Sequence, residues 1–191
     1  VTGFTTTDAN FPVTPSLLNP GGAFVSTDSA GNWTAVSAGL ASIVVNAVKV
    51  NPANASQLFA GTDHGVARSA DGGATWQQNF TASATDNGEA SAILAQTVLS
   101  LALEPGNPAV LYAGTSGHGV FKSSNGGNSW TTNSTGLGNL TVSALAVDPN
   151  SITTVYAATD AGVFRSVDGG TNWFASSGGL GGNAVRDLAM L

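Results

Sequence analysis

The sequence predicts an all-β fold, a β-propeller of four-stranded antiparallel blades with about four blades in its 191 residues. Two features of the sequence lead to this prediction. A segment that starts with Ser and ends with Trp occurs four times, at residues 26–33, 69–76, 123–130 and 166–173, and holds all four Trp residues. Consecutive copies begin 43, 54 and 43 residues apart. A period of roughly 40 residues with several short strands per unit is typical of propeller blades.

Each repeat is expected to contain three strands before its Ser-to-Trp segment and a fourth after the Trp. The first repeat is incomplete, with a weak strand at 16–18 before a clearer one at 22–26. The later repeats place their first three strands at 45–52, 58–62 and 65–69, at 98–105, 111–115 and 119–123, and at 142–149, 155–159 and 162–166. Residues 1–191 are therefore expected to form a single propeller domain or a segment of one.

The four Ser-to-Trp segments, called the boxes below, have the composition of a tight turn between antiparallel strands. Short Ser, Asp or Asn side chains accept hydrogen bonds from nearby N–H groups, Gly supplies positive φ, and the Trp ring covers the turn. The residues with these predicted structural roles are Ser26, Asp28 and Trp33; Ser69, Asp71, Gly73 and Trp76; Ser123, Asn125, Gly127 and Trp130; and Ser166, Asp168, Gly170 and Trp173.

The boxes resemble the Asp-box, or bacterial neuraminidase repeat, of sialidase-like propellers. That family also includes sortilin-type receptors, xyloglucan-degrading glycoside hydrolases and photosystem II assembly factors. Residues 69–76 match every position of the motif, whereas Asn125 replaces an Asp and Ala30 replaces a Gly. We therefore expect the first and third boxes to be distorted. The resemblance implies a structural element at the outer rim and specifies no activity.

The two ends of the chain predict an incomplete ring. Residues 185–191 match the first strand of a further blade, and the first repeat lacks a clear first strand. The last strand is expected to pair into the first blade and so remove an exposed edge. Because four-bladed rings are tight and the family usually has six or more blades, either two chains share a ring or a longer parent chain completes it.

The composition excludes several classes of function. Charged residues make up 8% of the chain, the formal net charge is −6, and five basic residues are scattered singly. Nucleic-acid binding is therefore not expected. No run of about 18 apolar residues is present, so no membrane span is predicted. The abundance of Gly, Ala, Ser, Thr and Asn favours an extracellular or cell-surface location, with the periplasm as an alternative.

Enzymatic motifs are weak. A sialidase needs three convergent Arg residues, a Tyr nucleophile and a Glu; here Arg68 and Arg165 fall at equivalent repeat positions, as do Tyr112 and Tyr156, which indicates a structural role. Asp63 and Asp160 lie in Thr-Asp-x-Gly segments similar to the one that carries a catalytic acid in xyloglucanases. Two such carboxylates suit an inverting glycosidase, but an Asp that caps a tight turn is the favoured interpretation.

Two His residues complete the candidates. His64 and His118 occupy equivalent turns, where two imidazoles on neighbouring blades suggest a shared metal or a pH sensor. No third strong ligand has the right spacing, so the sequence predicts surface turns there, with no metal and no cofactor.

Differences in loop length between the repeats predict which face carries the function. The boxes connect the third and fourth strands, and the face opposite them carries an insertion of 10 residues between Trp76 and Val98. Variable loops on a constant scaffold usually carry function. The predicted function is a non-catalytic binding or assembly module that contacts a glycan or protein through this face. The alternatives are a fragment of a xyloglucanase-like hydrolase and a structural subunit of an extracellular assembly. The candidate ligand-binding residues are Asp63, His64, Asp86, Glu89, His118 and Asp160.

Overall fold

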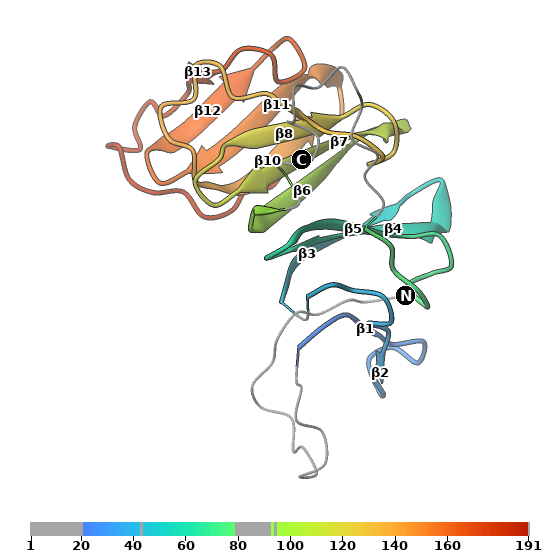
Figure 1. Cartoon of the computed structure of the whole chain (residues 1–191). Helices are drawn as coiled ribbons and strands as arrows, with labels where there is room; N and C mark the ends of the chain where they lie inside the picture. Colours follow the sequence, from blue (N-terminus) through green and yellow to red (C-terminus); the bar gives the residue numbers. More distant parts are fainter. Residues whose placement is uncertain (1–20, 43, 79–92, 94, 191) are drawn as a thin grey trace.

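The computed structural model describes residues 21–42, 44–78, 93 and 95–190, and these contain no α-helix. Four antiparallel sheets follow one another in chain order (Figure 1). Their strands are β1(Phe24–Val25) and β2(Thr34–Ala35); β3(Val45–Asn51), β4(Asn54–Thr62) and β5(Gly65–Ser69); β6(Val98–Glu104), β7(Asn107–Thr115), β8(Val120–Ser123) and β9(Thr131–Thr132); and β10(Val142–Asp148), β11(Ser151–Thr159), β12(Gly162–Ser166) and β13(Phe174–Ala175). The predicted all-β propeller architecture is confirmed, and the four sheets are called blades 1 to 4 below.

The blades share one register. Val45, Val98 and Val142 each open the first strand of a blade opposite a Thr that ends the second strand, and a register shift follows this pair in all three blades. The fourth strand is short: β9 and β13 have two residues each, and in blade 2 it is reduced to one bridge between Arg68 and Gln77. The repeat detected in the sequence is therefore a repeat of strand pairing.

The core lies between blades, where large side chains pack against small ones. The first strands of successive blades are neighbours, β3 beside β6 and β6 beside β10. A Cβ atom added at Gly61 would lie 2.7 Å from Val98 Cγ1, and one at Gly114 would lie 2.7 Å from Val142 Cγ1. Because strand backbones approach the neighbouring blade this closely, only Gly fits at these two positions.

The four boxes fold with the same hydrogen bonds. In each, the Ser Oγ donates to the Asp or Asn Oδ1 at 2.8 to 3.0 Å, and the same Oδ1 accepts the backbone N–H four residues further on at 2.8 or 2.9 Å. The expected distortion of the first and third boxes is wrong. Asn125 supplies the same acceptor as an Asp, and Ser29 and Ala30 adopt φ of 59° and 70°, the conformation that Gly adopts in the other boxes.

A second repeated element, not expected from the sequence, follows the box in blades 1, 3 and 4 and links blade 1 to blade 2 and blade 3 to blade 4. Four residues after a box Trp, a Ser-x-Gly-Leu segment occurs at residues 37–40, 134–137 and 177–180, called the seats below. Each seat Ser hydroxyl forms two hydrogen bonds with one residue of its own blade: it accepts from that residue's N–H and donates to its C=O. The pairs are Ser37 with Ala23, Ser134 with Val120 and Ser177 with Val163. The residue after the seat Ser accepts a hydrogen bond from the next box Trp N–H at 2.8 Å in the first two seats.

The end of the described chain lacks strand pairing. Within the described residues, 185–190 form no strand, and none of them pairs with β1 or β2. A backbone hydrogen bond connects this segment to blade 4: the Val185 N–H donates to the Thr159 carbonyl at 2.9 Å. The closure of the first blade by residues 185–191 thus stays a prediction, and the weak strand at 16–18 and Leu191 lie outside the described residues.

Candidate functional site

The structure separates the two ends of each blade. The box N–H groups of Gly72, Gly126 and Gly169 donate to carbonyls near the start of the second strand, so the boxes lie on the same side as the turns between the first and second strands. On the other side, the turns between the second and third strands bond the connections that lead to the next blade, for example Gly119 N–H to Leu140 O at 2.8 Å. This second side, called the loop face below, carries the predicted site residues Asp63, His64, His118 and Asp160.

Asp63 and His64 form a polar turn on the loop face of blade 2. His64 Nδ1 lies 3.0 Å from Asp63 Oδ1, and their side chains are 33% and 63% exposed for Asp63 and His64 respectively. Burial by itself raises the pKa of the Asp63 carboxyl, but hydrogen bonds from His64 and Ser42 outweigh it, so the pKa is lowered below its usual value of 3.8. Asp63 is therefore a carboxylate at neutral pH and an acceptor of hydrogen bonds.

Asp160, in the equivalent turn of blade 4, forms an ion pair that the sequence did not suggest. Arg186 Nη1 lies 2.8 Å from Asp160 Oδ1, and both side chains are exposed. The contact follows from the hydrogen bond between Val185 and Thr159, which brings residue 186 beside this turn. Arg186 carries no motif, so only its position in space identifies it.

The remaining candidates are scattered. His118 is exposed in the turn of blade 3, between the other two turns in chain order, and its turn backbone bonds the carbonyl of Leu140. Within the described residues, no three His, Cys, Asp or Glu side chains converge as a metal site would require. The described part of the chain also has no helix that could cross a membrane. Asp86 and Glu89 lie outside the described residues.

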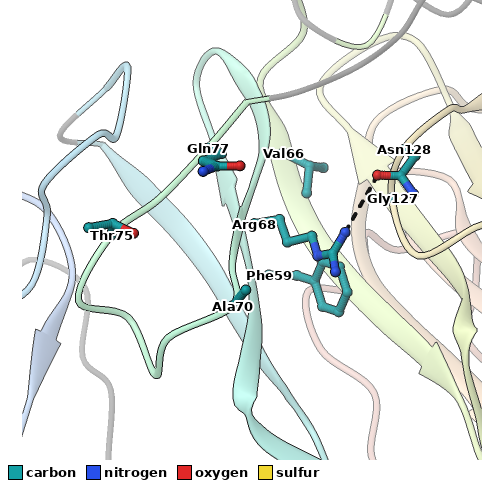
Figure 2. A pocket seen from close by; sticks show the side chains of 8 residues that line it. All are labelled: Phe59, Val66, Arg68, Ala70, Thr75, Gln77, Gly127 and Asn128. Atoms are coloured by element: carbon teal, nitrogen blue, oxygen red, sulfur yellow. Dashed lines mark hydrogen bonds between the residues drawn. The ribbon is translucent and has the colours of Figure 1, made fainter.

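A cavity of about 200 Å³ lies between the boxes of blades 2 and 3, and its lining includes none of Asp63, His64, His118 and Asp160 (Figure 2). Phe59, Arg68 and Asn128 are among its lining residues, and Figure 2 shows the Arg68 guanidinium beside the Phe59 ring and directed at Asn128. A structural role was expected for Arg68 because it occupies a repeat position. Blade 2 has Phe59 where blades 3 and 4 have Tyr112 and Tyr156, and this difference was the sequence signal that could have revealed the cavity.

Comparison with known proteins shows likeness in structure alone. No family model matches the sequence, and no curated protein matches it. An ancestral GH74 enzyme is similar in structure, with a TM-score of 0.66 and 26% identity over 81% of this chain and 21% of that one. The GH74 xyloglucanase of Xanthomonas campestris has a TM-score of 0.62 and 21% identity over 84% of this chain and 28% of that one.

A third similar structure has a different role. It is the extracellular domain of a putative hybrid two-component system from B. thetaiotaomicron, with a TM-score of 0.60 and 16% identity over 87% of this chain and 22% of that one. The chain thus spans about a quarter of the length of these proteins. Together they support the β-propeller fold.

Proposed function

We propose that the chain is part of a carbohydrate-binding β-propeller that acts outside the cytoplasm, and that it contacts a glycan through its loop face without catalysing a reaction. The observation that carries this proposal is the likeness to GH74 enzymes, with 26% identity over 81% of the chain for the ancestral enzyme. The likeness to an extracellular domain supports the location. As the chain spans about a quarter of those proteins, their activity is not assigned to it.

The chemistry of the loop face suits sugar hydroxyls. Asp63 and Asp160 offer exposed carboxylate oxygens, and His64 and Arg186 hold them by contacts of 3.0 and 2.8 Å. Carboxylates accept hydrogen bonds from hydroxyl groups and repel anions. A neutral or cationic ligand is therefore favoured at this face, and a neutral glycan fits better than a phosphorylated or sulfated one.

The same geometry argues against acid catalysis by Asp63. A glycosidase general acid must hold its proton near neutral pH, which requires a raised pKa. The pKa of Asp63 is lowered. Asp160 Oδ1 is in contact with the Arg186 guanidinium at 2.8 Å. Asp63 is therefore not prepared to donate a proton to a leaving group.

A second candidate function is hydrolysis of a xyloglucan by a larger propeller to which this chain contributes. The GH74 likeness favours it. In that case Asp63, the carboxylate held in place by His64 and Ser42, would serve as the general base, and a residue elsewhere would supply the acid.

Calorimetric titration with a xyloglucan oligosaccharide tests the proposal. We expect binding to the intact chain and no release of reducing ends. Asp63→Asn and Asp160→Asn should each weaken binding about fivefold, because a charge-assisted hydrogen bond is roughly twice as strong as a neutral one.

Asp148→Asn is the matched control, since Asp148 caps a turn on the box side by accepting the Asn150 N–H at 2.8 Å. It should bind as the wild type does. Equal loss in all three variants, or no binding by the wild type, would contradict the loop-face site. Release of reducing ends that disappears in Asp63→Asn would favour the hydrolase.

A further inference from the structure

The corner between blades 3 and 4 is closed by two side chains that hold one carbonyl. Tyr112 donates from its hydroxyl to the Gly169 carbonyl at 3.2 Å, and Lys122 Nζ donates to the same oxygen at 2.8 Å. The ammonium group also lies 5.3 Å from the centre of the Tyr112 ring. Tyr112 is fully buried, and a Cβ at Gly170 would lie 3.1 Å from its ring. This corner has no space for a ligand.

The corner between blades 2 and 3 is its structural equivalent and is open. Phe59 pairs with Arg68 in the register in which Tyr112 pairs with Lys122. Phe59 has no hydroxyl to donate, and its ring packs near Gly127, where a Cβ would lie 3.4 Å away. The substitution of Phe for Tyr and of Arg for Lys coincides with the cavity of about 200 Å³ shown in Figure 2.

The Arg68 guanidinium is poorly satisfied at this corner. Its Nη1 reaches Asn128 Oδ1 at 3.5 Å, which is beyond the usual length of a good hydrogen bond. Its Nε is buried and has no hydrogen-bond partner among the described residues. A buried donor on a charged group costs free energy unless an acceptor meets it. The residues that line the cavity include no acidic side chain.

A guanidinium with unmet donors in a cavity favours an anionic ligand that has two acceptor oxygens. The planar fork of Arg matches a carboxylate, which accepts two parallel hydrogen bonds. Phe59 and Val66 supply apolar surface, and Thr75 and Asn128 supply polar atoms, so the cavity suits a small carbon skeleton that carries hydroxyls. Its volume lies below the ~300 Å³ at which pockets for drug-sized molecules begin, which limits the ligand to about one sugar unit.

We propose that the corner formed by Phe59, Arg68 and Asn128 binds a small carboxylate ligand of the size of one uronic acid, with the carboxylate on the Arg68 guanidinium. This site lies on the box side of the blades and is separate from the loop face. It would therefore be an acid-recognition site distinct from the glycan contact proposed for the loop face.

The test is an NMR titration of the intact chain with galacturonate, and with galactose as the neutral comparison. Galacturonate should shift the Arg68 Nε and Gly127 amide signals, and galactose should not. Phe59→Tyr with Arg68→Lys rebuilds the closed corner with residues that the chain already uses at the equivalent positions. We expect this double variant to stay folded and to lose galacturonate binding at least tenfold.

Tyr112→Phe is the matched control, because it changes the same repeat position at the other corner. It should leave galacturonate binding unchanged, and a thermal melt of each variant shows that the fold is retained. Equal responses to galacturonate and galactose, or undiminished binding by a folded Phe59→Tyr, Arg68→Lys variant, would overturn the proposal.

Discussion

The box carboxylates illustrate how single residues stabilise the fold. Asp28, Asp71 and Asp168 each have a pKa lowered from 3.8 to about 2. For Asp71 the causes are hydrogen bonds from the side chain and backbone of Thr75 and from Ser69. The ionised form is favoured in the folded chain, since these donors point at it. The third box has no charged residue at this position, because Asn125 replaces the Asp of the other boxes.

This difference predicts how stability depends on pH. A carboxyl whose pKa is lower in the folded state adds stability above its unfolded pKa, and that stability is lost as the pH falls through the folded pKa. The free energy of unfolding should therefore be flat above about pH 5 and fall between about pH 4 and 2. Urea unfolding across this range, with a neutral reference, measures it. Asp71→Asn, which copies the residue found in the third box, should fold and show a shallower fall; an unchanged slope would mean that Asp71 does not contribute.

The seats show how one short element joins blades. Gly39 and Gly136 have φ of 86° and 87°, and a Cβ at either would collide with the backbone of Trp76 or Trp173. Those Trp side chains are 2% exposed and donate from Nε1 to Val36 O and Asn133 O. The first two seats thus receive the box of the next blade through backbone contacts that leave no room for a side chain. Gly179, in the last seat, has a similar φ of 84° and no such neighbour among the described residues.

Substitution by Ala at two seats isolates the packing contribution. Both Gly136→Ala and Gly179→Ala should cost about 1 to 2 kcal/mol for the positive φ. Gly136→Ala should cost about 1 to 3 kcal/mol more, because backbone atoms cannot yield cheaply to the added methyl group. Chemical denaturation of both variants measures the difference. Equal costs would show either that the Trp173 backbone yields easily to a methyl group at residue 136, or that other atoms also pack against residue 179 in the last seat.

At the scale of the whole molecule, the outer side of the last blade is more exposed than the corresponding sides of blades 2 and 3. Phe59 and Tyr112 are fully buried against the next blade, whereas Tyr156 at the same position is partly exposed. Leu180 in the last seat is 39% exposed, and Phe174 is 65% exposed. These side chains match a surface on which another blade packs, and we propose that a second copy or a parent chain completes the ring there.

The mass of the chain in solution tests this. We expect light scattering to show association that grows with concentration and that Leu180→Asp reduces, because a charge would be buried in the interface. Far-ultraviolet circular dichroism checks that the variant is folded. A wild-type chain that stays monomeric throughout the concentration range would exclude completion by a second copy.

The sequence by itself determined the repeats, the approximate positions of the strands and the boxes, because these depend on contacts between residues close in the chain. The box hydrogen bonds join residues two or four positions apart, so their residue types recur at fixed spacing. Strand pairing within a blade also joins neighbouring segments, which is why most of the fold was predictable.

The tertiary structure alone decided which side chains from different repeats meet. The contact of Arg68 with Asn128 joins residues 60 positions apart, and that of Lys122 with Gly169 joins residues 47 apart. The sequence shows that Phe59 and Arg68 stand where blade 3 has Tyr112 and Lys122, but it does not show which residues of the next blade these side chains meet. The packing of the blades determines the difference. The Tyr112 hydroxyl and the Lys122 ammonium reach the box of blade 4, whereas a cavity remains where Phe59 and Arg68 face the box of blade 3.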